Sequence, residues 1–385
     1  MFCAVLLLGG AGRITAHAAD GEGGEISDTV EELIDALDSD GLNNLLSPLT
    51  DKALAIFGGG DFVSIISGIV SGNITLDYSG VLAYILSLVG TSLEGVLWLL
   101  VTIIAVAVLY SVIGGIKSKF SSDTIAKTVH IASMISVLTI IASTTYSVID
   151  ICRNMIEMIN TQMSVLFPII LTLMTATGAS ATAAVYQPAL AVISSGIMQL
   201  LSVILIPMVL FAFVFMTVGS VSGEMRLNKM AEFVLSAVKW IMGTAFFVMC
   251  AFMSVQGITA SVFDSISVRT AKFTMSKYLP VIGSYLSEGI NLILSGSVIV
   301  KNAIGYSAIL LLVLSVLPVV IQLIVYSLTL KLAAAVTEPL GNEVMSNYLS
   351  KISGLVNVLI ALVVGAAFVY FIFILLVVMT GNIVL

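Results

Sequence analysis

Charged residues are scarce in this chain. They make up 10% of its 385 residues, while hydrophobic residues make up 59%. This balance is far too apolar for a soluble domain and indicates a polytopic membrane protein. The few charges are also unevenly spread, because residues 20–61 hold eleven acidic residues and one base, Lys52. The chain therefore has an acidic segment near its start and a nearly neutral membrane body, without a basic stripe that could bind nucleic acid.

Cysteine and histidine are rare as well, which limits the chemistry available. The cysteines Cys3, Cys152 and Cys250 are far apart and predict packing thiols instead of a disulfide framework. No cluster of His, Cys, Asp and Glu has metal-ligand spacing, and the G-x-x-x-x-G-K-[ST] motif of ATP-binding loops is absent. Gly58-Gly59-Gly60-Asp61 fits the G-x-G-D string of intramembrane aspartyl proteases, but it lies in the acidic segment and has no partner Asp within a span. Ser180 only loosely resembles a rhomboid-type serine, and nothing in the sequence brings His130 close to it. We expect no enzyme, no catalytic residue, no metal and no cofactor.

The start of the chain resembles an export signal. Residues 2–12 are apolar and Ala16-His17-Ala18 fits the small-x-small rule, so we expect residues 1–19 to be a signal peptide. Residues 20–79 then form an acidic extracytoplasmic segment. The apolar spacing predicts amphipathic helices at residues 26–38, 42–49 and 62–70. Packing of these helices on the protein's own body is the default, because an acidic face makes anionic lipid a poor target.

Long apolar runs fill the chain from residue 80 onward, and residues 80–162 make up the N-terminal membrane helices. A helix needs about 20 apolar residues to cross a bilayer. The clear runs are residues 96–116, 128–149, a run that ends at Gly219, 240–262, 303–330 and 354–379. With short hairpins added, they predict an all-α polytopic membrane protein with about six to eight membrane helices.

The loops between the runs fix the expected topology. Lys117, Lys119 and Lys127 mark a cytoplasmic loop by the positive-inside rule, which agrees with an exported N-terminus. Asp150, Arg153 and Glu157 are expected on a short external stretch. Residues 263–302 are placed outside, against the charge rule, and residues 331–353 are placed in a cytoplasmic loop.

Residues 163–220 contain no charged residue and no histidine, yet they do not form two smooth spans. Pro168 and Pro188 flank a patch of small and hydroxylated residues around Gly178. Irregular backbone at membrane depth survives only against protein or a water-filled cavity. One interpretation is a broken or re-entrant hairpin over residues 167–193, followed by a true span. The other is two ordinary helices with a small-residue contact face.

The C-terminal body follows the same order of features twice, in residues 163–277 and 278–385. Each unit has a short apolar run that opens at a proline, a small-residue patch, a long span with an internal proline, a polar loop and a final span. The matched prolines are Pro168 with Pro280 and Pro207 with Pro318. Such units would be parallel, and paired proline kinks would shape a central cavity or a subunit contact.

Polar residues inside the clear spans are few. They are Gln187, Gln199, Gln256, Gln322 and Asn357. The simpler interpretation is interhelical hydrogen bonds that help packing, and the other is a polar conduit. Because the clear spans have almost no ionisable residue, a proton-coupled transporter is disfavoured.

Several motifs resemble one known family when they are taken in order. They are Phe167-Pro168, Thr177-Gly178, Gln187-Pro188, Thr270-Ala271-Lys272-Phe273, Pro280-Val281-Ile282-Gly283 and Glu338-Pro339-Leu340-Gly341. The chain is similar in this respect to the stage III sporulation protein AE family of endospore-forming bacteria. The resemblance covers most of the chain and brings no catalytic residue with it.

The resemblance implies a multi-pass protein of the mother-cell membrane around the forespore, with an extracytoplasmic N-terminus. Its implied partners are the other stage III sporulation operon proteins, namely a secretion-type ATPase, small membrane proteins and ring-forming proteins, together with stage II sporulation protein Q. The implied function is a component of a channel or secretion-like complex. The alternatives are a permease-like transporter with a cavity between the two repeats, near residues 175–184 and 294–297, and a purely structural scaffold.

Overall fold

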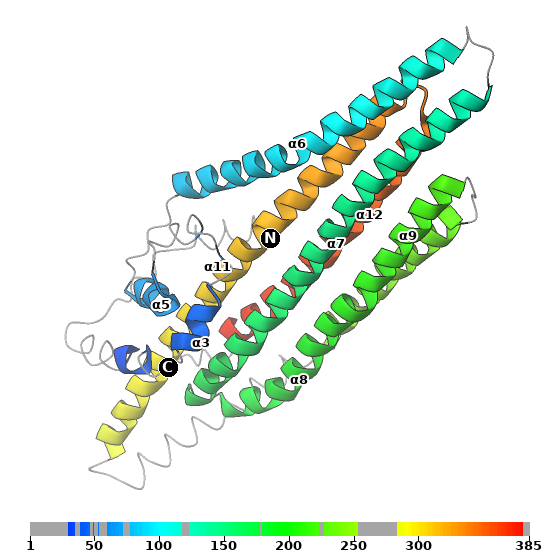
Figure 1. Ribbon diagram of the computed structural model, residues 1–385. Helices are drawn as coiled ribbons and strands as arrows, with labels where there is room; N and C mark the ends of the chain where they lie inside the picture. Colours follow the sequence, from blue (N-terminus) through cyan, green and yellow to red (C-terminus); the bar gives the residue numbers. More distant parts are fainter. Residues whose placement is uncertain are drawn as a thin grey trace.

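The computed structural model describes residues 30–34, 39–46, 49, 53, 60–71, 78–117, 123–177, 179–222, 227–252 and 283–379. Every regular element in these ranges is helical, and the long helices lie side by side in an elongated bundle (Figure 1). Within the described residues, six stretches are long and apolar enough to cross a membrane: Gly80–Leu109, Ile135–Ala176, Ser195–Ser220, Leu227–Phe252, Ile293–Thr337 and Glu343–Met379. The predicted all-α polytopic fold is therefore confirmed.

The centre of the bundle is the antiparallel pair α11 (Gly283–Thr337) and α12 (Glu343–Met379). Most of the inward side chains of α12 are fully buried. The Tyr370 hydroxyl donates to the Ala308 carbonyl at 3.3 Å, and the Ser327 and Ser353 hydroxyls lie 2.9 Å apart. Hydroxyl contacts of this kind are typical of helix pairs that pack closely in membranes.

The helices are longer than the apolar runs suggested. Helix α6 (Tyr78–Lys117) continues through Gly90 and Gly95 and begins well before the predicted run of residues 96–116. Helix α7 (Asp123–Ala176) does not end near Ile149, and α11 extends through Lys301, which was assigned to a loop. A helix that has already formed extends at little cost, whereas each new start requires nucleation. Single charged residues therefore did not end these helices.

The expected hairpin around Gly178 is formed by two long helices. Helix α7 ends at Ala176 and α8 (Ser180–Gln199) begins three residues after Thr177. The Thr177 hydroxyl donates to the Met174 carbonyl at 2.7 Å, and the Ala179 amide donates to the same carbonyl at 3.0 Å. The chain thus reverses at the predicted position, but Pro168 and Pro188 lie inside long helices and no short re-entrant hairpin forms.

Pro207 is associated with an irregular turn, whereas Pro318 is not. Helix α8 continues through the π-helical turn η1 (Leu200–Leu205) into α9 (Ile206–Ser222). Proline has no amide proton and its ring collides with the carbonyl one turn earlier, and a widened turn relieves both problems. Helix α11 remains α-helical through Pro318. The internal repeat that pairs these two prolines stays a prediction.

The described helices of the acidic N-terminal segment pack on the bundle, as expected. Residues 30–34 are helical, with Val30 and Ile34 buried. Helix α3 (Ser39–Asn44) carries the buried Leu42, and α5 (Phe62–Val70) matches the predicted helix. The Asn43 amide oxygen accepts from the Phe62 amide at 2.9 Å. The predicted signal peptide lies outside the described residues.

The ends of the helices alternate as the predicted topology requires. The end of α6, the start of α7 and the α11–α12 turn lie at one end of the bundle, and the α7–α8 turn lies at the other (Figure 1). The loop between α11 and α12 comprises only residues 338–342, shorter than the predicted 331–353. Of the segment placed outside, residues 263–282 lie outside the described ranges and residues 283–302 belong to α11.

Candidate functional site

A polar stripe runs along one side of α7, within the apolar stretch Ile135–Ala176. Its residues follow one another at intervals of three or four, which keeps them on one side of a helix. They are Tyr146, Asp150, Arg153, Glu157, Asn160, Ser164, Pro168, Thr172 and Thr175. All of them are exposed except Asn160, which is half-buried. We refer to this set as the α7 stripe.

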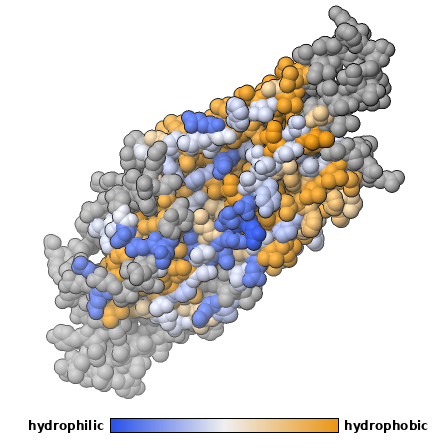
Figure 2. All heavy atoms as spheres, viewed as in Figure 1, coloured by the Kyte–Doolittle hydropathy of each residue, from blue (hydrophilic) through white to orange (hydrophobic). Residues whose placement is uncertain are grey.

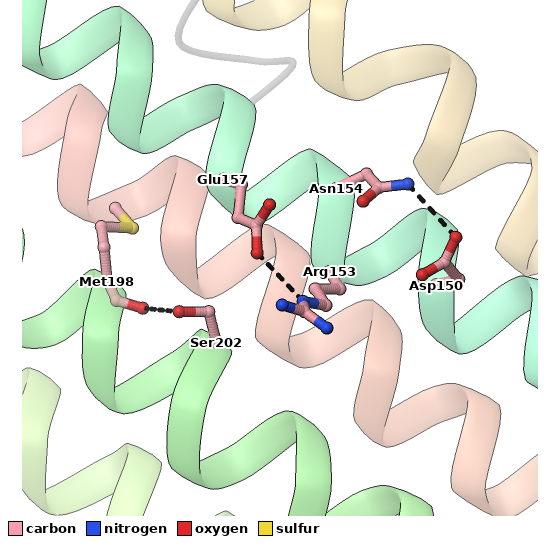
Figure 3. A network of polar contacts seen from close by, with 6 residues as sticks. All are labelled: Asp150, Arg153, Asn154, Glu157, Met198 and Ser202. Atoms are coloured by element: carbon pink, nitrogen blue, oxygen red, sulfur yellow. Dashed lines mark hydrogen bonds and ion pairs between the residues drawn. The ribbon is translucent and has the colours of Figure 1, made fainter.

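Three charged residues, Asp150, Arg153 and Glu157, follow one another toward the N-terminal end of the α7 stripe. The Arg153 Nε donates to the Glu157 Oε1 at 3.0 Å, and their side chains are 58% and 52% exposed. The Asn154 amide donates to the Asp150 Oδ2 at 3.3 Å. Figure 3 shows the Arg153–Glu157 pair on the side of α7 toward the turn that carries Ser202, with the Asn154–Asp150 contact farther along the same helix. The charges therefore pair mainly within the helix and present outward-facing atoms.

The charged residues lie near mid-depth of the apolar bundle. They line a cavity of about 280 Å³ together with Ser202, Pro207 and Leu210. Those three residues are in the middle of the candidate span Ser195–Ser220. Hydrophilic residues gather at the same place in the space-filling view, with hydrophobic surface toward both ends (Figure 2). The structure places residues 150–157 within one continuous helix and inside the candidate span Ile135–Ala176, not on a separate stretch between two spans.

A larger cavity follows the same groove toward the α7–α8 turn. Its volume is about 830 Å³. Its described lining residues are Asn160, Met163, Ser164, Phe167, Pro168, Leu171, Thr172, Thr175, Ser180, Ala183, Ala184, Gln187 and Ser195. None of these is ionisable, so this part offers hydroxyl and amide groups on an otherwise apolar wall. The two cavities follow one another beside α7, and we refer to this part of the surface, between α7 and its neighbours α8, η1 and α9, as the polar groove.

Other residues of α7 contact the central helices α11 and α12. Phe167 packs against the rings of Tyr370 and Phe373, with centroids 6.4 and 5.1 Å apart. The Thr145 and Tyr326 hydroxyls lie 3.0 Å apart, and the Gln162 amide donates to the Ser315 hydroxyl at 3.0 Å. These contacts fix the rotation of α7 about its axis. The α7 stripe is therefore held facing outward.

The structure places the predicted polar residues at different positions. Gln187 lines the larger cavity, and Gln199 is exposed at the end of α8. Gln322 is half-buried on α11, and the Asn357 Oδ1 accepts a hydrogen bond from Ser327 at 2.9 Å. Gln256 lies outside the described residues. The predicted set is thus not gathered at one site, and the groove contains only Gln187 of it.

The helix-break residues are divided in the same way. Pro168 lines the larger cavity and Pro207 lines the smaller one. Pro188 is exposed on α8 and Pro318 is half-buried on α11. Gly178 and Pro280 lie outside the described residues. The two prolines at the groove are therefore Pro168 and Pro207, which belong to the same predicted repeat unit.

Sequence reasoning missed the main residues of the groove. Asp150, Arg153 and Glu157 were recognised as a polar stretch, but they were placed between spans because a span was taken to end near Ile149. Their spacing continues into Asn160 and Ser164, which is the signal that one helix carries all of them. Among the described residues, no group of three or more His, Cys, Asp and Glu could hold a metal ion.

The fold and the groove define a multi-pass α-helical membrane protein with a polar surface along one side of its bundle. The family model described as Stage III sporulation protein AE matches residues 61–381. The chain therefore belongs to the stage III sporulation protein AE family, as the sequence motifs predicted. It is 23% identical over 285 residues to Stage III sporulation protein AE of Bacillus subtilis (strain 168), which covers 74% of this chain and 71% of that protein. No solved structure matches.

Proposed function

We propose that this protein is an integral membrane subunit of a channel or secretion-like complex that connects the mother cell with the forespore during stage III of sporulation. The proposal rests on the polar groove. The chain's membership of a sporulation family indicates the process in which the groove would be used. A groove with charged residues at mid-depth and hydroxyl-bearing residues beyond them is suited to form part of the wall of a hydrated passage.

The proposal places the chain in the mother-cell membrane around the forespore, with an extracytoplasmic N-terminus. The basic residues Lys117 and Lys331 lie toward the same end of the bundle, which supports a cytoplasmic position for that end. The helices α3 and α5 then lie toward the space between the two membranes. Its partners are the other stage III operon proteins, including the ATPase that would supply energy, and stage II sporulation protein Q.

Deletion of the gene in an endospore-forming host tests the proposal. We expect development to stop after engulfment, with the engulfed forespore failing to mature, and expect the wild-type gene to restore heat-resistant spores. Engulfment should proceed normally and serves as the internal control, scored by membrane staining. Normal numbers of heat-resistant spores from the deletion strain would contradict the proposal.

A permease-like transporter is the second candidate, and the cavity of about 830 Å³ beside residues 175–184 favours it. A cavity of this size can hold a small solute. However, it lies between α7 and α8, and residues 294–297 are not among its described lining residues. Purified protein in liposomes separates the two functions. Solute flux without any partner would indicate a permease, and vesicles that remain tight would indicate a subunit of a larger complex.

A further inference from the structure

We propose that a second copy of this chain closes the polar groove, with the α7 stripes of the two copies facing each other. Arg153 of each copy then pairs with Asp150 of the other. The proposal concerns the groove that the proposed function uses as a passage wall. It requires only that the chain spans a membrane, and it does not depend on the sporulation role.

The groove cannot remain open to lipid at its middle. Arg153 and Glu157 are each more than half exposed, at the depth of Pro207 in the span Ser195–Ser220. Ionisable residues at such a depth face protein or a water-filled cavity, because hydrocarbon does not solvate them. The surrounding exposed residues Val203, Ile204 and Phe211 are apolar, so lipid would otherwise contact this surface. Within a bilayer, the charged atoms therefore need either a protein partner or a water-filled space that protein encloses, and a second copy can supply both.

The charges of the α7 stripe are complementary to themselves. Asp150 and Arg153 are three residues apart, which is about 4.5 Å along a helix. In two parallel copies related by an axis along the membrane normal, Arg153 of one copy is level with Arg153 of the other, and the other copy's Asp150 and Glu157 lie about 4.5 and 6 Å away along the axis, on either side of that level. A guanidinium has five N–H donors in a planar fork and can bind two carboxylates. Its Nε already binds Glu157, so the terminal nitrogens can bind Asp150 of the second copy.

The Asp150 carboxylate, which would accept from Arg153 of the second copy, is held by a contact within its own helix. Asp150 uses its Oδ2 to accept from Asn154, within the same turn of α7. That contact engages one of the two oxygens of an exposed carboxylate, so the other oxygen can accept a further hydrogen bond. The α7 stripe of one chain thus presents both a hydrogen-bond acceptor, the Asp150 carboxylate, and a donor, the terminal nitrogens of Arg153. A foreign helix is not needed to supply either charge.

Closure by a second copy would also enclose the rest of the groove. Beyond Glu157 the stripe continues with Asn160, Ser164 and Thr172, and Gln187 faces it from α8. Two such surfaces brought together form an uncharged, hydroxyl-lined space with charged residues at one end. The groove of one chain is only half of this space. The site is therefore incomplete without the second copy.

Disulfide crosslinking in membranes tests this arrangement. The full chain, with its native cysteines replaced by alanine, carries Tyr146→Cys or Ser164→Cys, which lie on the stripe on either side of the charges. Two copies with tags of different size are expressed together and oxidised. We expect a crosslinked band with the mass of two copies from both positions.

Charge reversal then separates ion pairing from simple proximity. Asp150→Arg and Arg153→Asp, each expressed alone, should reduce crosslinking about tenfold, because like charges now face each other. When the two variants are expressed together, crosslinking should return. The arginine introduced at position 150 of one copy then meets the aspartate introduced at position 153 of the other. The native Arg153 of the first copy pairs with the native Asp150 of the second. Recovery in the mixture also shows that both variants fold. The same reversal at the exposed Glu94 of α6, Glu94→Arg, is the matched control and should leave crosslinking unchanged.

Four results would overturn the proposal. The first is that the chain without charge reversals gives no band with the mass of two copies, and the second is that the single reversals crosslink as well as their mixture. The third is that Glu94→Arg reduces crosslinking as much as Asp150→Arg or Arg153→Asp does. The fourth is a crosslinked band whose mass requires a different protein. Spore formation is measured separately. If the expressed chain crosslinks as expected but the deletion strain forms normal spores, the proposed function is rejected and the pairing of copies stands.

Discussion

At the scale of single residues, the two sides of α7 show why polar groups inside a membrane bundle differ in their role. Gln162 is almost completely buried, and its amide donates to Ser315 while its Oε1 has no partner among the described residues. Glu157, a few residues earlier, is exposed and paired with Arg153. The first residue contributes to packing at a desolvation cost, whereas the second has no packing reason to be charged.

Replacement of Gln162 tests this distinction. In Gln162→Leu the buried amide is lost, and the Ser315 hydroxyl still donates to the Leu311 carbonyl at 2.6 Å. Because the lost hydrogen bond and the removed desolvation cost offset each other, we expect the free energy of unfolding to change by no more than about 1 kcal/mol. Gln162→Glu should destabilise by about 2 kcal/mol or more, since a carboxyl would be buried without enough donors.

Thermal unfolding in detergent measures both variants against the wild type. A large loss of stability in Gln162→Leu would contradict the interpretation, because it would mean that the Oε1 of Gln162 has a partner when the protein is folded.

At the scale of elements, helix positions were predictable and helix lengths were not. The range of α5 is readable from the sequence, because its alternation of buried and exposed residues is local. The turn near Gly178 is also readable, because small and hydroxylated residues gather there. The length of α7 is not, since Asp150 to Glu157 resemble a loop until neighbouring elements show that the helix continues. The same holds for α11, where the buried Lys301 lies inside the helix.

The groove followed from the sequence only in part. The prolines Pro168 and Pro207 and the amide of Gln187 were singled out as polar or irregular positions in apolar runs. The charged centre was not, because a 20-residue span was assumed and the stripe crosses that limit. The packing of two helices against each other decides which side of α7 faces outward, and a single sequence does not contain that information.

Helix α12 gives a test of packing between elements. A Cβ at Gly365 would collide with the ring of Phe246 in the helix Leu227–Phe252. We expect Gly365→Ala to destabilise the protein by about 1–3 kcal/mol, because the aromatic ring has to move. Adding Phe246→Leu should restore part of this loss.

Gly354→Ala is the matched control on the same helix. A Cβ at Gly354 meets nothing within 4 Å, so this variant should be neutral or stabilised by about 0.5–1 kcal/mol through helix propensity. Unfolding midpoints in detergent compare the three variants with the wild type. An equal loss from both glycine replacements would refute the contact between the helices.

At the scale of the whole molecule, the bundle has two chemically different ends. The α11–α12 turn and the end of α6 share one end, with basic residues nearby, and the α7–α8 turn is at the other end. Because the candidate spans lie between these ends, the two turns should be on opposite sides of the membrane.

Cysteine labelling tests this arrangement. Glu338 and Ser180 are both exposed and belong to the two turns. In a background without native cysteines, Glu338→Cys should react with a membrane-impermeant maleimide only in vesicles that expose the cytoplasmic face. Ser180→Cys should react only in vesicles of the other orientation. Labelling of both positions from one side would exclude the topology.

The length of the apolar helices has a consequence for how the lipid meets the protein. The stretch Ile135–Ala176 contains 42 residues, which corresponds to about 63 Å, roughly twice the hydrocarbon thickness of a bilayer. Hydrophobic mismatch on this scale would require a tilt of about 60°, well beyond the range of membrane helices. The excess apolar length therefore needs shielding by neighbouring protein above or below the lipid, and an isolated copy in a thin membrane should be prone to aggregation.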